Sequence, residues 1–335
     1  MENIMRHLAT IQTVSEVLPI EGAEFIEKIR VRDWWCVSKK GEFSTGDACV
    51  YFEIDSLLPS SNPVFSFLAA GSREVTIPVE GGGTASGYRL KTVKLRGQIS
   101  QGLALRQAAF GLDAEIGTDV SSDIGVILWE PPLSKQVAAI ARGPFPCFIP
   151  KTDEERVQNL RSEIAVRAGE QCYVTEKLDG TSATFYRLGE FHACSRNLDT
   201  REGNLYWDAA EKYGLVSGLP EGFAVQGEVI GEGIQGNPLK RKGQEFYAFN
   251  VYDIKAGMGL EFSALCKFCK NLNISMVPVV QVGPLGSDVT AIIAMADGDS
   301  LLTPGRPREG LVFRTMERDR LSFKVISNRY LLKEK

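Results

Sequence analysis

The chain has 335 residues, a length that allows two domains with separate hydrophobic cores. Hydrophobic residues make up 44% and charged residues 24%, as in an ordinary folded globular protein. The net charge of −4 argues against a nucleic-acid-binding protein that is basic throughout. No apolar run reaches the roughly 18 residues of a membrane helix, and the N-terminus lacks a secretion signal. We therefore expect a cytoplasmic protein with no membrane association.

The side-chain inventory argues against several kinds of active site. His7 and His192 are the only histidines, too few for a multi-histidine metal site, and their scarcity disfavours Ser-His-Asp or Cys-His hydrolases. Seven cysteines, an odd number, indicate reduced thiols. Cys266 and Cys269 have zinc-like spacing, but the apolar residues around them recur at helical spacing, so we expect helix packing. Catalysis would depend on lysine and carboxylates.

Residues 1–128 are predicted to form short β-strands. The apolar or alternating segments are 8–17, 25–37, 48–54, 88–95 and 102–105. Five short strands with a basic hairpin suggest a small barrel of OB type. The glycine-rich run at 80–87 predicts a mobile connection at a hairpin tip.

One segment of this domain, residues 81–112, contains no acidic residue. It carries five basic residues, Arg89, Lys91, Lys94, Arg96 and Arg106. A basic stripe of this kind can follow a phosphate backbone. It also fits a solvated strand face that avoids edge pairing, and the stripe alone leaves both interpretations open.

Repeated prolines place the domain connection at 129–150. Residues 152–155 then form a capping-box pattern, which predicts a helix that runs to about Ala168. Beyond it we expect strands at 171–177, 182–187, 224–229, 245–252, 311–314 and 322–326, and helices at 205–213, 261–272 and 289–296. The predicted fold class is α+β: an OB-type β-barrel, then a domain over 151–335 with antiparallel sheets and flanking helices.

Residues 231–236 match the glycine pattern of dinucleotide-binding loops. That pattern requires a helix after the third glycine, whose N-terminus holds the pyrophosphate. Here the continuation to Gly243 is short and contains Pro238. We therefore assign these glycines to a loop in which backbones approach closely.

The run Glu176-Lys177-Leu178-Asp179-Gly180 carries the candidate chemistry. Lys177 falls at the end of an apolar strand and precedes a glycine turn. Partial desolvation there would lower the pKa of the lysine and free its lone pair to attack phosphorus. We interpret Lys177 as the covalent nucleophile of an ATP-consuming nucleotidyltransferase. The structural alternative is an exposed hairpin lysine.

Further segments carry suitable side chains near strand ends. Arg196 offers a guanidinium to a phosphate, Glu228 can accept a ribose hydroxyl, and Phe249 can stack on a purine. Glu309 can hold a divalent metal near the α-phosphate, and Lys324 can neutralise that phosphate. Each residue has a structural explanation by itself, but their order and positions favour one site.

Together these segments resemble the ATP-dependent RNA ligases that seal nicks, a branch of the covalent nucleotidyltransferases. The run at 227–235 is similar to the RNA-ligase form of the third motif. With the runs at 149–156 and 323–327, it looks like the Deinococcus type of RNA ligase, which carries an N-terminal OB module. The resemblance covers essentially the whole chain.

The resemblance implies three steps. Lys177 attacks ATP to form lysyl-AMP, AMP passes to an RNA 5′-phosphate, and an RNA 3′-OH displaces AMP. Arg196, Glu228 and Phe249 would bind the adenylate. Glu309 would hold Mg²⁺ or Mn²⁺, and Lys324 would contact the phosphate.

The resemblance also assigns supporting roles. Asp179 would act through hydrogen bonds or a metal-bound water. The OB module would bind nicked duplex RNA or an RNA/DNA hybrid, through the phosphates and 2′-OH groups of A-form geometry. Its candidate contacts are Arg89, Lys91, Lys94 and Arg96. No obligate protein partner is evident.

One position departs from the family pattern. The family often has a second lysine two residues after Lys324, where this chain has Ile326. Arg329 or Lys333 would be the nearby replacements. The alternatives are a DNA ligase, a capping-type nucleotidyltransferase, or a non-catalytic nucleic-acid-binding protein on a ligase scaffold. A role in RNA repair or in RNA maturation would fit equally.

Overall fold

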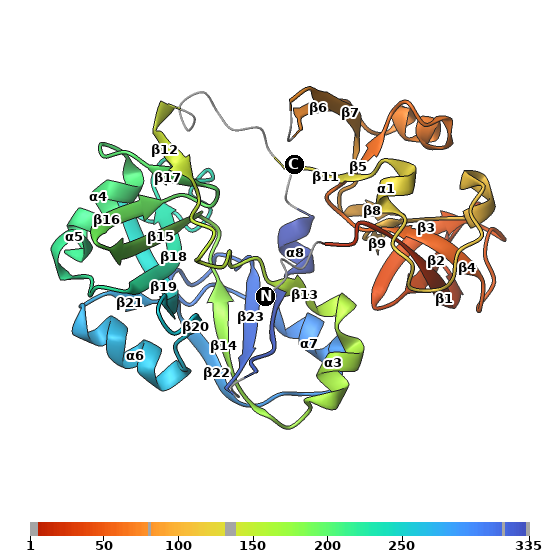
Figure 1. Ribbon diagram of the computed structural model, residues 1–335. Coiled ribbons are helices and arrows are strands. Elements are labelled where there is room, and N and C mark those ends of the chain that lie inside the picture. Colours follow the sequence, from red (N-terminus) through yellow and green to blue (C-terminus); the bar gives the residue numbers. More distant parts are fainter. Residues whose placement is uncertain (1–5, 80–81, 131–138, 317–318, 333–335) are drawn as a thin grey trace. The chain divides into compact units, whose positions relative to one another are not determined.

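A computed structural model describes residues 6–79, 82–130, 139–316 and 319–332 of the protein (Figure 1). The chain separates into two compact units, residues 1–133 and 134–334. Different clusters of buried apolar side chains form the cores of the two units. We call them the N-terminal unit and the C-terminal unit.

The N-terminal unit contains an antiparallel sheet with the strand order β10-β4-β1-β2-β3. Its strands are β1 (Ala9–Pro19), β2 (Ile26–Val31), β3 (Trp34–Lys39), β4 (Ala48–Phe52) and β10 (Leu103–Leu105). Strand β4 is covered on both faces, since Val50 and Phe52 pack in one buried cluster and Cys49 and Tyr51 in another. Alternate side chains of β4 therefore pack into two separate hydrophobic clusters, one on each face of the sheet.

A second antiparallel sheet of this unit has the order β11-β5-β7-β6. Its strands are β5 (Ser56–Pro59), β6 (Glu74–Pro78), β7 (Thr84–Arg89) and β11 (Ile127–Leu128). Strands β8 (Val93–Leu95) and β9 (Gln98–Ser100) form a separate hairpin. The connections contain η1 (Pro63–Ala70), η2 (Gln107–Phe110) and α1 (Ser121–Ile124). Phe65 of η1 packs edge-on against Phe52, with ring centroids 5.4 Å apart, so η1 closes over the core.

Three expectations for this unit require correction. The segment 25–37 is two strands, because the chain turns between β2 and β3 at Arg32, which has a φ of 52°. The segment 88–95 spans the end of β7 and all of β8. The glycine-rich run at 80–87 is partly strand, since β7 begins at Thr84 and pairs with β6. Residues 80 and 81 lie outside the described residues.

The larger sheet of the C-terminal unit has the order β12-β17-β16-β15-β18-β19-β20, with β21 parallel to β19. Its strands are β12 (Ala141–Pro144), β15 (Thr181–Leu188), β16 (Glu190–Cys194), β17 (Leu198–Thr200), β18 (Phe223–Gly231), β19 (Gln244–Asp253), β20 (Met258–Gly259) and β21 (Ser275–Met276). Helices α4 (Leu205–Lys212), α5 (Leu215–Gly218) and α6 (Phe262–Asn271) flank it (Figure 1). Trp207 of α4 and Leu265 of α6 are buried with Phe185 and Phe246 of the strands.

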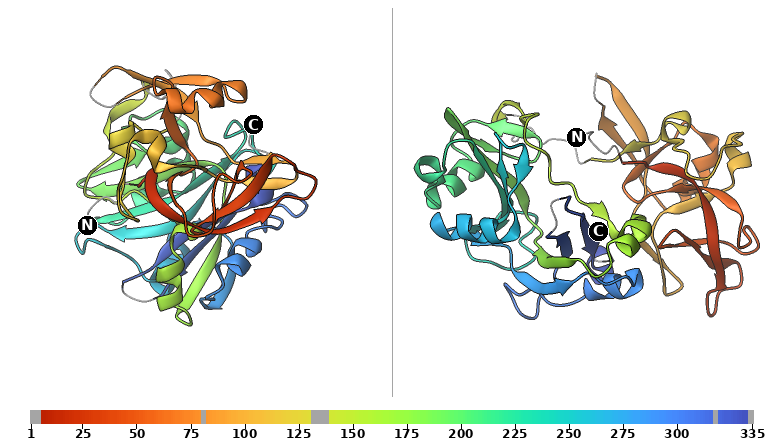
Figure 2. Two further views of the ribbon diagram at one scale, coloured as in Figure 1. Left: turned by 90° about the vertical axis from the view of Figure 1, so that its right-hand side faces the viewer. Right: turned by 60° about the horizontal axis from the view of Figure 1, so that its bottom comes forward.

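The smaller sheet of this unit has the order β13-β24-β23-β14-β22. Its strands are β13 (Glu155–Arg156), β14 (Gln171–Lys177), β22 (Val279–Pro284), β23 (Gly310–Thr315) and β24 (Ser322–Ile326). The neighbouring helices are η3 (Val157–Asn159), α3 (Arg161–Val166), α7 (Val289–Met295) and α8 (Asn328–Leu331). Figure 2 shows the ribbon from two further sides. Ile164 of α3 and Ile292 of α7 pack against Phe313 and Phe323.

The predicted helix from Thr152 to Ala168 is wrong in its first half. Glu155 and Arg156 pair in parallel with Phe323 and Lys324, which holds this stretch in an extended conformation. A regular α-helix begins only at Arg161. Tertiary pairing with β24 therefore overrides the local capping signal.

The other three predicted helices correspond to α4, α6 and α7, whereas the short helices α5 and α8 were not predicted. Cys266 and Cys269 lie on α6, and Cys269 packs in the buried cluster beneath the larger sheet. In the described residues, no helix is long and apolar enough to cross a membrane. The architecture as a whole is the α+β class that the sequence predicts.

Candidate active site

Lys177 lies where the chain passes from one sheet to the other. It is the last residue of β14 in the smaller sheet, and Leu178, Asp179 and Gly180 lead directly into β15 of the larger sheet. A Cβ atom at Gly180 would lie 2.3 Å from the carbonyl oxygen of Val229 on β18. The crossover thus needs glycine, because its backbone packs against a neighbouring strand.

The ammonium of Lys177 is paired with the carboxylate of Glu309. Its Nζ lies 2.7 and 2.8 Å from the two Oε atoms. Lys177 is opposite Gly310 in the β14–β23 ladder, so Glu309, just before β23, is beside the lysine. The two side chains are 30% and 14% exposed, which leaves the pair only partly screened by water.

The environment raises the pKa of Lys177 above its ordinary value. Burial acts to lower this pKa, but the carboxylates of Glu309, Glu228 and Asp179 together outweigh it. The expectation that desolvation lowers the pKa of this lysine is therefore wrong. The structure instead keeps the amine protonated through its acidic neighbours.

Three carboxyl groups gather around this one amine. Burial raises the pKa of Glu228 to about 8, and the charge of Glu309 adds to the effect. Burial likewise raises the pKa of Glu309 and of Asp179. Glu228 accepts a hydrogen bond of 3.3 Å from the Ser182 hydroxyl, and Asp179 accepts one from the Tyr330 hydroxyl. Acidic groups crowded together in a partly buried site, with shifted pKa values, are typical of functional sites.

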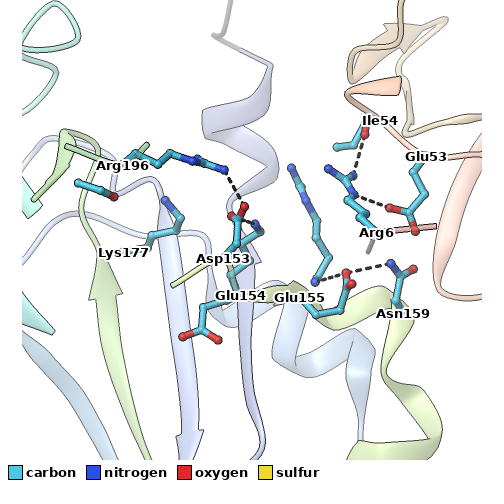
Figure 3. A network of polar contacts seen from close by, with 12 residues as sticks. Arg6, Glu53, Ile54, Asp153, Glu154, Glu155, Asn159, Lys177 and Arg196 are labelled. Atoms are coloured by element: carbon cyan, nitrogen blue, oxygen red, sulfur yellow. Dashed lines mark hydrogen bonds and ion pairs between the residues drawn. The ribbon is translucent and has the colours of Figure 1, made fainter. Parts of the chain in front are cut away.

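Two predicted phosphate ligands meet at a third residue. Arg196, in the turn between β16 and β17, donates to Asp153 at 2.6 Å (Figure 3). The Lys324 Nζ lies 3.7 Å from the other carboxylate oxygen of Asp153. A carboxylate that joins a guanidinium and an ammonium occupies the kind of position that suits a phosphate.

A hollow open to solvent lies next to Arg196. It is lined by Phe145, Lys151, Thr152, Asp153, Ser182, Thr184, Arg196 and Gln226. Gln226 is buried, donates to the Pro150 carbonyl oxygen at 2.9 Å and accepts from Asn250 at 2.8 Å. Hydrogen bonds therefore hold Gln226 in place within the lining, which also carries two cations, Lys151 and Arg196, and the anionic Asp153.

Phe249 lies at a β-bulge. The pairing of β18 with β19 shifts between Gln226 and Gly227, and Phe249 is the unpaired residue at that shift. A bulge changes the direction of a side chain relative to its strand. The ring is partly buried with Leu178, and the Arg314 guanidinium lies 5.8 Å from its centroid.

Sequence reasoning missed several residues of this region. The capping pattern assigns Asp153 only to a helix start, and no motif gives Gln226 or Tyr330 a role. The position of Gln226 two residues before Glu228 on a strand places both side chains on one face, and this signal was available. Nothing in the sequence pattern indicates that Tyr330 contacts Asp179.

Ile326 occupies the position at which the resemblance predicts a second lysine. Ile326 is buried on β24 opposite Gly310, so this position contributes no cation. Arg329 lies on α8. Lys333, the other suggested replacement, is outside the described residues.

The glycine pattern at 231–236 forms no helix. Turns connect β18 to β19, and a Cβ atom at Gly231 would lie 2.0 Å from the Gly243 carbonyl oxygen. The assignment of a close backbone approach is confirmed at this glycine. Gly236 instead has a left-handed φ of 69°, and a Cβ atom added there would meet no atom within 4 Å.

The four predicted nucleic-acid contacts of the N-terminal unit fall into two groups. Arg89 is held within its unit, 2.7 Å from Asp55 and 3.7 Å from the centroid of the Trp129 ring. Lys91, Lys94 and Arg96 are exposed on and before the β8–β9 hairpin.

Comparison with protein families gives two matches. Residues 8–107 match an OB-fold domain, and residues 170–326 match the RNA ligase family. Among curated proteins, no match to the chain was found.

Solved structures of Naegleria gruberi RNA ligase are similar over nearly the whole chain. A lysine-to-methionine mutant with AMP and Mn is 43% identical with a TM-score of 0.89, covering 98% of this chain and 99% of that one. A lysine-to-alanine mutant with ATP and Mn is 43% identical with a TM-score of 0.89, covering 97% and 98%. The ligase with pyrophosphate is 43% identical with a TM-score of 0.88, covering 98% and 99%.

These matches confirm the predicted order of an OB-fold followed by a ligase domain. The identity of 43% extends over the residues of both units. The chain belongs to the RNA ligase family.

Proposed function

We propose that the protein is an ATP-dependent RNA ligase of the nick-sealing Deinococcus type, which joins a 3′-OH to a 5′-phosphate through lysyl-AMP. The observation that carries the proposal is the placement of Lys177 at the crossover between two sheets, with its amine held by Glu309. The similar Naegleria ligase structures contain AMP, ATP or pyrophosphate, which supports nucleotide chemistry for a chain of this fold.

The first step uses Lys177 as the nucleophile. Its side chain is 30% exposed, so the ammonium can release a proton to solvent. The Nζ then attacks the α-phosphorus of ATP, the bond to pyrophosphate breaks, and AMP is joined to the lysine. In the second step an RNA 5′-phosphate oxygen attacks the same phosphorus and releases Lys177. In the third step the 3′-OH attacks the activated 5′-phosphate and releases AMP.

The carboxylates around Lys177 suit a divalent metal. Asp179, Glu228 and Glu309 offer hard oxygen donors, which Mg²⁺ and Mn²⁺ prefer. Within the described ranges, no group of three or more His, Cys, Asp and Glu side chains is arranged to hold an ion directly. Glu309 would therefore be the main protein ligand, with the others acting through water. A bound ion would supply positive charge that competes with Lys177 for Glu309 and neutralises the α-phosphate.

The other residues bind and orient the nucleotide. Arg196 and Lys324 would exchange Asp153 for phosphate oxygens, because both already hold an anionic group. Phe249 would stack on the adenine, and Glu228 would bind the ribose. Ile326 contributes no charge, so we assign the phosphate contacts to Arg196 and Lys324.

The two units would divide the work. We propose residues 1–128 as the nucleic-acid-binding module, 129–150 as the connection and 151–335 as the adenylylation domain. Lys91, Lys94 and Arg96 are exposed and suit phosphate contacts. Arg89 would reach a phosphate only by leaving Asp55, so we rank it below the others.

Labelled ATP tests the assignment of the nucleophile. The wild-type protein incubated with α-labelled ATP and Mg²⁺ or Mn²⁺ is expected to form a covalent protein–AMP adduct. Lys177→Ala and Lys177→Arg should form none, since neither side chain provides the amine. Lys270→Ala is the matched control, because Lys270 is exposed on α6. An adduct that survives Lys177→Ala would reject the assignment.

Defined nicks separate the alternatives. Duplexes whose 3′-OH strand at the nick is RNA or DNA should be sealed only when that strand is RNA. Equal sealing of DNA would favour a DNA ligase. Transfer of a nucleotide to a 5′-diphosphate end would favour a capping enzyme, and absence of adduct with every nucleotide would favour a non-catalytic binding protein.

A further inference from the structure

A tyrosine far along the sequence contacts the crossover that follows Lys177. The Tyr330 hydroxyl, on the short helix α8, donates a hydrogen bond to the Asp179 carboxylate. In the described part of the chain, no other group donates a hydrogen bond to that carboxylate. Asp179 is two residues from Lys177, so the contact acts next to the nucleophile.

Helix α8 is itself fixed by several hydrogen bonds. The Ser327 hydroxyl accepts from the Tyr330 backbone amide at 3.2 Å and donates to Asp297 at 2.6 Å. Asp297 directly follows the C-cap of α7, so α8 is tied to a packed helix. Leu331 is buried, which adds an apolar contact. Tyr330 is thus held in position from its backbone.

The same turn also contacts a second carboxylate residue. The Ser327 backbone amide donates to the Glu309 carbonyl oxygen at 2.8 Å. Arg308, just before Glu309, donates to the carbonyl oxygens of Met295 and Ala296 at the end of α7. The segment after β24 therefore connects the backbone of Glu309 with the side chain of Asp179.

The charges around Asp179 make this restraint consequential. Lys177 on β14, Glu228 on β18 and Glu309 before β23 all act electrostatically on the same small region. If the Asp179 carboxylate could rotate freely, attraction to Lys177 and repulsion by Glu228 and Glu309 would allow it more than one orientation. A neutral donor on a fixed helix selects one orientation without adding charge.

We propose that Tyr330 is a positioning residue for lysine adenylylation, holding Asp179 in the orientation that the reaction requires. The inference rests on the proposed function of Lys177. Tyr330 acts through Asp179 and does not itself touch the nucleotide. Its removal should therefore slow adduct formation at saturating ATP without changing the ATP concentration needed for half-maximal rate.

Tyr330→Phe removes the hydroxyl and keeps the ring. Single-turnover adduct formation should slow by about tenfold or more, the effect of losing a hydrogen bond to a charged group. The ATP concentration at half-maximal rate should stay within about twofold. The matched control is Tyr213→Phe, which loses a hydroxyl that accepts from the Phe246 amide at 3.1 Å in the core of the larger sheet. It should form the adduct at the wild-type rate.

A double-mutant cycle separates positioning from general stabilisation. In an Asp179→Asn background, Tyr330→Phe should have no further effect on the rate, because its partner is already altered. Independent, multiplicative losses would overturn the proposal, as would a wild-type rate in Tyr330→Phe. The melting temperatures of Tyr330→Phe and Tyr213→Phe should also be compared. If the melting temperature and the adduct rate fall equally in both variants, the loss reflects general destabilisation and the proposal is overturned.

Hydrogen exchange tests the contact without relying on activity. Backbone amides of residues 178–181 should exchange faster in Tyr330→Phe than in the wild type, and not in Tyr213→Phe. Unchanged exchange there would refute the restraint. If the wild type forms no adduct while this exchange still responds to Tyr330→Phe, the proposed function fails and the contact stands.

Discussion

Gly180 provides a sharp test of how closely the position of Lys177 depends on backbone packing. In Gly180→Ala the new Cβ would lie 2.3 Å from the Val229 carbonyl oxygen and 2.7 Å from Cγ2 of Ile230. Ordinary contacts between such atoms are longer, so the two segments must separate by about 1 Å. Val229 pairs with Thr181 in the β15–β18 ladder and is fully buried, so it has little freedom to retreat. The crossover, with Lys177 at its start, must move instead.

The size of the effect follows from this displacement. Overpacking of a fitted interior costs about 1–3 kcal/mol of unfolding free energy. A misplacement of about 1 Å at a reacting group lowers a rate by about 100-fold. We therefore expect Gly180→Ala to fold with reduced stability and to form the lysine adduct far more slowly than its loss of stability explains.

Urea unfolding and single-turnover adduct formation measure the two effects separately. Gly286→Ala is the control, because no atom lies within 4 Å of its added Cβ and its φ is not left-handed. It should behave as the wild type in both assays. A Gly180→Ala protein with wild-type stability and rate would refute the link between this close approach and the position of Lys177.

Three further predictions concern charge. Burial raises the pKa of Glu228 to about 8, so the folded protein retains a proton that the unfolded chain releases near pH 4.5. Without metal, the unfolding free energy of the wild type should therefore fall relative to that of Glu228→Gln as pH rises through this window, by at most about 1.4 kcal/mol per pH unit. Urea unfolding at several pH values measures both free energies. Parallel curves of unfolding free energy against pH would contradict the prediction. Asp153→Asn should bind pyrophosphate several-fold more tightly in calorimetry, because Arg196 loses a competing anion; weaker binding would instead show that Asp153 orients Arg196. Replacing both Lys94 and Arg96 by alanine should lower the slope of log affinity for duplex RNA against log salt by about 1 per residue, and an unchanged slope would exclude the hairpin from the RNA contact.

The predicted strands succeeded where the chain signals burial strongly. The strand expected at 171–177 has those bounds, because its apolar run lies in the interior of the smaller sheet and is paired on both sides. The strand at 322–326 also agrees. Strand β22 was missed, since it is an edge strand whose exposed residues, such as Val282, give no clear alternation. The hydrophobic pattern of a sequence indicates which side chains are buried, and an edge strand such as β22 buries few of them.

The candidate site, too, was predicted only in part. The order of motifs led to the expectation that Lys177, Glu309 and Glu228 share one site, and the structure brings their charges together. The sign of the pKa change was wrong, because the sequence shows the apolar strand before Lys177 but not the acid placed beside it by the β14–β23 pairing. The contact of Tyr330 with Asp179 joins residues 151 positions apart, and no local pattern encodes it.

The pair of Lys177 with Glu309 also bears on the selectivity of the enzyme toward electrophiles. A neutral lysine amine reacts with acyl phosphates and cyanate, and the stable amide or carbamyl group formed by each such event would block Lys177. While Glu309 holds the amine protonated, its lone pair is not available to these compounds. In the proposed mechanism a bound cation or nucleotide would draw Glu309 away, and the amine would then become reactive only when that substrate is present.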